Sequence, residues 1–284
     1  MSLRPRFARS RPTARYLLQT ESHVYALAIS ASVLLAFYPF LTVMLSFCHN
    51  VLRWRAAEQA IYLALNDFFA GDAGSFFVRN LKPWMVGNVS ITSMLLLMFT
   101  ANGIFEPIEV ALNHAWGVTE NRSYLRNQLV SLGMIFACGG LALLSLMFTA
   151  ANSQWVQTWA GSRENLLTWL QVLFFKLAAV PLLIFALFLI YWLLPNRKVN
   201  PRQVAPAAIA VGLALEGLKY INLLIWPLLQ SKLEREYNIF KYSVTILLWS
   251  FVSALIVLAG ARWTASGGEE TVSETPASGV LGLS

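Results

Sequence analysis

Residues 101–128, ANGIFEPIEVALNHAWGVTENRSYLRNQ, mark the point where an apolar part of the chain becomes polar and charged. Upstream, the 17 residues from Val89 to Phe105 carry no charge, close to the shortest length that crosses a hydrocarbon core about 30 Å thick. We therefore expect a membrane-spanning helix that ends near Phe105. Pro107 then removes the backbone donor for the Gly103 carbonyl, which predicts either a kink or a fresh helix from Pro107 to Trp116.

Four polar residues in this stretch share one helical face, because they recur at steps of three and four: Asn102, Glu106, Glu109 and Asn113. One interpretation is a solvated stripe on a helix that leaves the bilayer. The other is that the carboxylates face a polar cavity inside a helix bundle, since ionisable groups near membrane depth are rare and usually functional. In that case Arg122 or Arg126 could neutralise them as part of a polar gate on the cytoplasmic side.

The composition indicates an integral membrane protein. Of its 284 residues, 57% are apolar and only 12% are charged, and the mean hydropathy is +0.58, which is far from ordinary soluble domains. The net charge of +7 does not indicate a nucleic-acid partner, because five arginines lie in the first 15 residues, where they suit membrane topology and anionic head groups. We expect no nucleic-acid binding.

Apolar segments recur along the chain and predict an all-α integral membrane protein with six transmembrane helices, at about 24–48, 89–105, 129–151, 166–194, 204–229 and 242–261. A basic tail, residues 1–23, precedes the membrane domain of residues 24–262, and a polar tail, residues 263–284, is expected to be disordered. Pro39, Pro107 and Pro181 are the expected helix breaks. The basic N-terminal tail and the basic turn at Arg197 and Lys198 place both termini in the cytoplasm.

The connection between the first two spans, residues 51–88, contains a predicted amphipathic helix. Its apolar positions are Ala57, Ile61, Leu65 and Phe68, and its polar positions are Glu58, Asn66 and Asp67. A helix on the outer membrane interface and a helix that caps the bundle both need one apolar face, so both interpretations stay open, with the interfacial one preferred. In the third span, Gly133 and Ala137 form a small-xxx-small step that predicts close helix packing.

Three charged residues fall inside the fourth and fifth spans: Lys176, Glu216 and Lys219. With a rise of about 1.5 Å per residue, both lysines would lie roughly 15 Å deep, and the three side chains could meet. They form either a structural ion pair between neighbouring helices or, together with Glu106, Glu109 and Asn113, a polar path for a charged substrate. Pro39 and Pro181 hold similar places in two three-helix halves, a weak pointer to a transport site.

Signals for enzymatic chemistry are missing from the sequence. His23, His49 and His114 are scattered along the chain, and Cys48 and Cys138 should lie at different depths. We therefore expect no metal centre, no disulfide and no cofactor. The sequence also has no Gly-rich phosphate loop.

Three blocks of the sequence carry a family fingerprint. The first is 103–122, with Asn113, Ala115, Trp116, Gly117, Glu120 and Arg122; the second is 25–40, with Ser32 and Tyr38-Pro39-Phe40; the third runs from Leu193-Leu194-Pro195-Asn196-Arg197-Lys198 to Ala261. Together they resemble the YihY/BrkB family (virulence factor BrkB-like) of bacterial inner-membrane proteins, formerly misnamed ribonuclease BN, from about Arg15 to Ala265. The resemblance implies a six-helix inner-membrane protein, linked by some proposals to envelope lipid traffic, without a settled biochemical activity.

The chain departs from the family pattern near its last span. Relatives often have Tyr-Gly-Ser where this chain has Lys241-Tyr242-Ser243, and Gly-Ala-Glu where it has Gly260-Ala261-Arg262. The second difference reverses a charge, so no role of that acid carries over. The old nuclease name finds no support in these residues, which lack an interleaved basic and aromatic surface for RNA, and we expect no ribonuclease activity.

These observations favour a protein that handles or translocates an anionic lipid or a similar amphipath in envelope lipid traffic. Membrane lipids are then its partners, and periplasmic lipid-transport proteins are candidate partners. The alternative is a membrane scaffold that recruits envelope proteins through its interfacial helix and tails. A transporter needs an internal polar cavity or a lateral opening, whereas a scaffold can be packed solidly.

Overall fold

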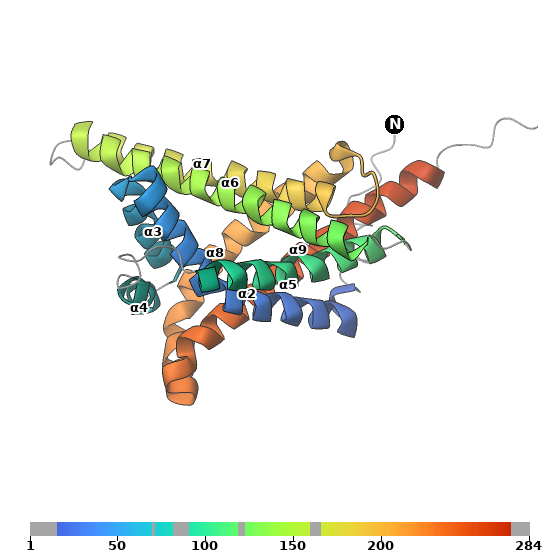
Figure 1. The fold of residues 1–284 in the computed structure, drawn as a ribbon, viewed down its shortest axis with the longest axis horizontal. Coiled ribbons are helices and arrows are strands. Elements are labelled where there is room, and N and C mark those ends of the chain that lie inside the picture. The colour runs from blue at the N-terminus through green and yellow to red at the C-terminus, as the bar shows by residue number, and fades with distance from the viewer. Residues whose placement is uncertain (1–15, 70–71, 82–90, 119–122, 160–165, 274–284) are drawn as a thin grey trace, which may run out of the picture.

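The computed structural model describes residues 16–69, 72–81, 91–118, 123–159 and 166–273, and all regular secondary structure in these residues is helical (Figure 1). This confirms the all-α prediction for the described part of the chain. In chain order the helices are α2 (Thr20–Ser46), the π-helix η2 (Phe47–Leu52), α3 (Arg55–Phe68), α4 (Asp72–Leu81), α5 (Ile91–Ala115), α6 (Tyr124–Trp159), α7 (Leu166–Leu193), α8 (Pro201–Tyr237), the 3-10 helix η4 (Asn238–Phe240) and α9 (Lys241–Ser273).

Four helical segments of the described residues are long and apolar enough to cross a membrane: Thr20–Leu52, Leu125–Ser145, Pro201–Tyr237 and Lys241–Ala265. A shorter apolar segment, Ala179–Leu193, lies in α7. The other two predicted spans coincide with α5 and α7, which are 25 and 28 residues long. The chain is therefore a membrane protein with several apolar helices, and the count of six crossings stays a prediction.

Prolines lie inside the helices without ending them. Helix α2 continues past Pro39, α5 past Pro107 and α7 past Pro181. The alternative of a fresh helix at Pro107 is therefore wrong, because Glu106 and Pro107 belong to one continuous helix that ends at Ala115. Each internal proline still removes one backbone hydrogen bond to the carbonyl four residues earlier.

Two helices extend further than their apolar segments indicate. Helix α8 continues to Tyr237, well beyond residue 229, where the fifth span was predicted to end, and η4 then turns the chain into α9. Helix α9 reaches Ser273, so residues 263–273, expected to begin a disordered tail, are helical. Residues 1–15 and 274–284, which make up most of the two predicted tails, lie outside the described residues.

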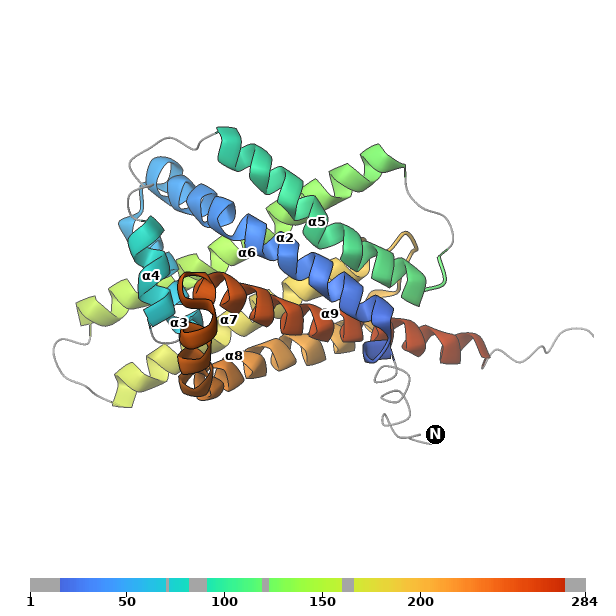
Figure 2. The ribbon, with the colours of Figure 1, turned by 90° about the horizontal axis from the view of Figure 1, so that it is seen from below.

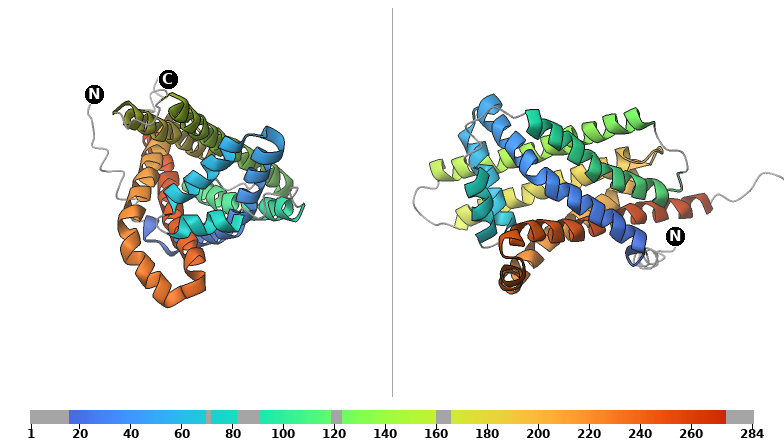
Figure 3. Two further views of the ribbon diagram at one scale, coloured as in Figure 1. Left: turned by 90° about the vertical axis from the view of Figure 1, so that its left-hand side faces the viewer. Right: turned by 60° about the horizontal axis from the view of Figure 1, so that its bottom comes forward.

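Helix α2 crosses the molecule between α5 and α9 and packs against both (Figure 2). Helices α6 and α7 run side by side along another face, and α8 packs between α7 and α9. The far end of α8, η4 and the start of α9 form an arm that projects from the rest (Figure 3). The two halves of α2 thereby contribute to different apolar clusters, one with α5 and α9 and one with α3 and α4.

The apolar faces of α3 and α4 are buried against the helix bundle. Ala57 and Ile61 of α3 and Phe77 of α4 join a cluster that includes Leu45 of α2 and Trp226 of α8. This burial favours a helix that caps the bundle over a helix whose apolar face meets lipid. The side chains of Asp67 and Phe68 lie outside the described part of the structure.

Glu58 differs from its expected place on the polar face of α3. It is 8% exposed, and its Oε1 lies 3.0 Å from Nδ1 of His49 in the π-helix η2. Burial of the phenol and, secondarily, the Glu58 carboxylate raise the pKa of Tyr62 to about 12. The acid thus ties α3 to the end of α2, since a buried carboxylate needs a hydrogen-bonding partner.

The end of α5 is fixed to the turn between α7 and α8 by polar contacts. Asn113 Oδ1 accepts a hydrogen bond from the backbone N–H of Asn196 at 2.8 Å. Arg197 donates from Nη1 to the Trp116 carbonyl at 3.4 Å, and its guanidinium lies 5.8 Å from the centroid of the Trp116 ring. Two blocks of the fingerprint that are far apart in sequence therefore meet in space.

Glycines allow close helix contacts at positions other than the predicted one. A Cβ at Gly260 of α9 would collide with side-chain atoms of Val211 and Tyr191, and one at Gly103 of α5 would lie 2.5 Å from Ser32 Oγ. At Gly133 no described atom lies within 4 Å of such a Cβ. The close packing predicted at Gly133 is therefore absent from the described residues.

The contact at Gly260 predicts a difference between two Gly→Ala substitutions. Gly260→Ala should lower the free energy of unfolding by about 1–3 kcal/mol, because the added methyl group overpacks a buried junction. Gly140→Ala, in open space on α6, should be neutral or stabilise by up to about 1 kcal/mol. Thermal unfolding of both proteins in detergent measures the difference, and equal stability would contradict the packing.

The contact at Asn113 predicts that its side-chain oxygen stabilises the fold. Asn113→Leu should destabilise by about 1–3 kcal/mol, because the Asn196 amide loses its acceptor, whereas Asn113→Asp keeps an acceptor and should cost less. His114→Leu changes the exposed neighbouring residue and serves as the control. The three melting temperatures decide, and an unaffected Asn113→Leu protein would refute the role of this hydrogen bond.

Candidate functional site

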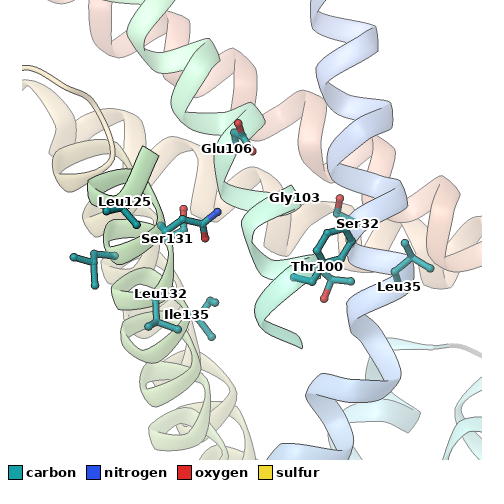
Figure 4. Close-up of a pocket in the computed structure, with 12 residues that line it drawn as sticks. Ser32, Leu35, Thr100, Gly103, Glu106, Leu125, Ser131, Leu132 and Ile135 are labelled. Atoms are coloured by element: carbon teal, nitrogen blue, oxygen red, sulfur yellow. The ribbon is translucent and has the colours of Figure 1, made fainter. Parts of the chain in front are cut away.

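A pocket of about 720 Å³ lies between α2, α5 and α6. Its polar lining residues come from all three helices: Ser32 of α2, Thr100 and Glu106 of α5, and Gln128 and Ser131 of α6. The other lining residues are Gly103 and apolar side chains, namely Leu35, Phe99, Leu125, Leu129, Leu132 and Ile135. Figure 4 shows the α6 residues standing opposite those of α5 and α2.

A second pocket of about 250 Å³ adjoins the first and shares Ile135 with it. The same three helices line this pocket, and it has no charged lining residue: Val33, Ala36, Phe37, Phe40, Ile104, Phe105, Ile135, Cys138 and Gly139. We call the two pockets together the α2–α5–α6 groove. The groove combines a part that contains polar groups with a part that is apolar, as an amphipathic ligand would require.

The predicted polar face of α5 divides between two environments. Glu106 is exposed and lines the groove. Glu109 and Asn113 are buried, at 4% and 5% exposure. Their burial rules out a fully solvated stripe. The side chain of Asn102 lies outside the described residues.

Glu109 is held by a residue of α6. When the Asn127 amide is oriented with its nitrogen toward the carboxylate, it donates to Oε1 at 3.1 Å and also to Oε2. A buried carboxylate is stabilised by such donors. Arg126 is exposed at the start of α6, and Arg122 lies outside the described residues. The gate proposed for these arginines stays a prediction.

Glu216 and Lys219 line a different pocket, of about 310 Å³. Lys219 Nζ lies 3.9 Å from Glu216 Oε1, and the two side chains are 24% and 28% exposed, respectively. Lys176 lies on α7, but its side chain is outside the described residues. The structure thus brings together Glu216 and Lys219, but separates them from the groove that Glu106 lines.

Two site residues carry no clear signal in the sequence. Ser131 lines the groove, is 1% exposed, and has an Oγ without a hydrogen-bond partner among the described residues. Trp249 lines the pocket with Glu216. A single serine in an apolar helix usually bonds to its own backbone, and a single tryptophan usually packs, so neither stands out before the helices are placed.

Among the described residues, no group of three or more His, Cys, Asp and Glu side chains could hold a metal ion. The candidate sites in the described part of the chain are therefore cavities lined by hydroxyl groups, amides and a few charged side chains.

Comparison with known proteins identifies relatives along nearly the whole chain. It is similar to the UPF0761 membrane proteins of Chromohalobacter salexigens (24% identical over 259 residues, 88% of this chain and 60% of the relative) and Acinetobacter baylyi (28% over 247 residues, 84% and 57%). It is also similar to that of Vibrio campbellii (24% over 266 residues, 90% and 82%). The chain thus spans less than two thirds of the first two relatives, and none of the three has an enzymatic name.

No solved structure matches the chain. The sequence model of the family described as Virulence factor BrkB matches residues 13–279. Because this match covers nearly all of the sequence and agrees with the membrane-protein relatives, the chain belongs to the virulence factor BrkB family.

Proposed function

We propose that this membrane protein binds an amphipathic lipid in the α2–α5–α6 groove and handles or translocates it in a bacterial inner membrane. The observation that carries the proposal is the junction of two pockets at Ile135, one with polar groups and one apolar. Volumes of about 720 and 250 Å³ are within or near the range of small-molecule sites. An acyl chain in the apolar pocket would gain about 25 cal/mol for each Å² removed from water.

The rim of the groove supports entry from the bilayer. Leu35, Phe99, Leu125 and Leu129 line the larger pocket and are also exposed. Large apolar side chains exposed together around an opening suit contact with acyl chains. A lipid could therefore move sideways into the groove without passing through water.

The polar part of the groove has a carboxylate as the one charged group among its described lining residues, together with hydroxyl and amide groups. Glu106 supplies a carboxylate. Pro39 and Pro107 have no N–H, so the carbonyls of Leu35 and Gly103, four residues earlier, lack their usual helical donors, and both residues line the groove. A head group with an amine or hydroxyl groups fits this set. The anionic head group expected from sequence finds no lysine or arginine among the described lining residues.

The placement in the membrane is part of the proposal. Helices α2, α5, α6, α7, α8 and α9 cross the inner membrane, α3 and α4 cap the bundle, and both termini are cytoplasmic. The 25 and 28 residues of α5 and α7 suffice for this, since about 20 residues span a hydrocarbon core. The positive turn at Arg197 and Lys198 favours its cytoplasmic location.

A scaffold that recruits envelope partners, periplasmic lipid-transport proteins included, is the second candidate. A scaffold of this kind would recruit partners through an amphipathic helix whose apolar face is free. The apolar faces of α3 and α4 are buried against the bundle, which leaves this role to the tails. The groove gives lipid handling the stronger support.

The proposed orientation predicts opposite labelling of the two ends of α8. In a protein whose Cys48 and Cys138 are replaced by serine, Lys198→Cys should react with an impermeant maleimide only from the cytoplasm. Arg235→Cys should react only from the outer side, because α8 separates the two positions. Labelling intact spheroplasts and inverted vesicles measures this. Reaction of both cysteines from the same side would disprove the crossing of α8, and exchanged sides would disprove the orientation.

The groove predicts a site of photo-crosslinking to a lipid with a diazirine on its acyl chain. Modified peptides should come from α2, α5 and α6, and Ile135→Trp should reduce the yield severalfold by filling the junction of the pockets. Phe136→Trp, at the adjacent position with a 62% exposed side chain, is the matched control and should leave the yield unchanged. Equal yields from both variants, with both proteins folded by thermal unfolding, would refute binding in the groove.

A further inference from the structure

The pocket between α7, α8 and α9 is separate from the groove and has its own chemistry. Its lining residues are Leu183 of α7, Trp249 and Ser253 of α9, and five residues of α8, namely Leu215, Glu216, Leu218, Lys219 and Asn222. It shares no lining residue with the groove. A ligand here would therefore contact none of the residues that line the groove.

Glu216 and Lys219 lie together without forming a closed ion pair. Their distance of 3.9 Å is longer than a hydrogen bond between charged groups, which is about 2.7–2.9 Å. The pair formed by Glu234 near the end of α8 and Lys241 at the start of α9 is closed, at 2.8 Å. The ammonium of Lys219 and the carboxylate of Glu216 thus both keep hydrogen-bonding capacity for a further group.

A second donor belongs to the same pocket. Trp249 is 8% exposed, and its Nε1–H has no acceptor among the described residues. A buried donor without an acceptor is destabilising, and a bound acceptor would remove that cost. Ser253, one helical turn further along α9, adds a hydroxyl group to the lining.

The charges in this pocket discriminate between classes of ligand. A purely anionic group beside Lys219 would be repelled by Glu216, and a purely cationic group would be repelled by Lys219. A group that carries both charges satisfies both residues. Apolar side chains also line the pocket, namely Leu183, Leu215 and Leu218, and they suit the glycerol and first chain carbons of a lipid.

We infer that the α7–α8–α9 pocket is a second lipid site, specific for a zwitterionic head group that contains a phosphate and an amine. Lys219 and Trp249 donate to the phosphate oxygens, and Glu216 accepts from the ammonium. The site does not depend on the proposed function of the groove, because the two share no residue.

Native mass spectrometry of the purified full-length protein tests this site with four probes. Phosphatidylethanolamine carries phosphate and amine, phosphatidylglycerol carries only the phosphate, and diacylglycerol carries neither. Soluble phosphoethanolamine has the head group without chains. The wild-type protein should bind phosphatidylethanolamine most strongly. A preference for phosphatidylglycerol, or equal binding of soluble phosphoethanolamine, would overturn the inference.

Three substitutions should change lipid binding in different ways. Glu216→Gln should reduce the preference for phosphatidylethanolamine over phosphatidylglycerol by roughly tenfold, as expected for the loss of one charged hydrogen bond. Lys219→Met should weaken both phospholipids relative to diacylglycerol. Trp249→Phe, which keeps the ring size but removes the N–H, should weaken them less, and it provides the measurement if Lys219→Met does not fold.

Matched controls distinguish a binding site from a structural pair. Glu234→Gln and Lys241→Met remove the closed pair between α8 and α9, whose residues do not line the pocket, and should leave lipid preference unchanged. Ile135→Trp fills the groove and should also leave this lipid preference unchanged. The experiment therefore tests the α7–α8–α9 pocket separately from the groove. Wild-type lipid preference in both Glu216→Gln and Trp249→Phe, with only their melting temperatures lowered, would show a structural ion pair and refute the site.

Discussion

Backbone hydrogen bonding in apolar surroundings is the constraint on which this structure depends. A membrane offers no water to an open N–H or C=O group, so a crossing segment must satisfy its backbone internally, as a helix does. This explains why α2, α5 and α7 continue past their prolines: losing one hydrogen bond costs less than ending a helix in hydrocarbon. The same constraint forces buried side chains to find local partners, as Tyr191 does when it donates to the Val257 carbonyl at 2.7 Å.

Hydropathy predicted the helices better than it predicted their ends. Residues 91–105 of the predicted span form the first part of α5, but the helix continues for ten residues more, to Ala115, because Glu109 and Asn113 find partners within the protein. Helices α8 and α9 likewise extend past their apolar segments. Charge and turn propensity mark where a helix leaves the hydrocarbon, and helix formation does not have to stop there.

The sequence alone did not predict which residues far apart in the chain contact each other. Nothing local indicates that Asn113 accepts from Asn196, or that Glu58 belongs beside His49 and not on a solvated face. Gly133 matched a packing pattern, whereas the close contact is made at Gly260, because a small residue permits contact only where another helix arrives. Periodicity correctly grouped Glu216 with Lys219, which are one turn apart. It could not show that Glu106 faces a separate groove, since that follows from how six long helices are arranged.

The prolines of α2 and α5 have a mechanical consequence for the groove between them. Pro39 and Pro107 each leave a backbone bond unmade at the level of a groove-lining residue, Leu35 in one wall and Gly103 in the other. A helix bends most easily where such a bond is missing. Both walls can therefore flex outward without breaking further backbone hydrogen bonds, so bending of α2 and α5 alone would change the width of the groove.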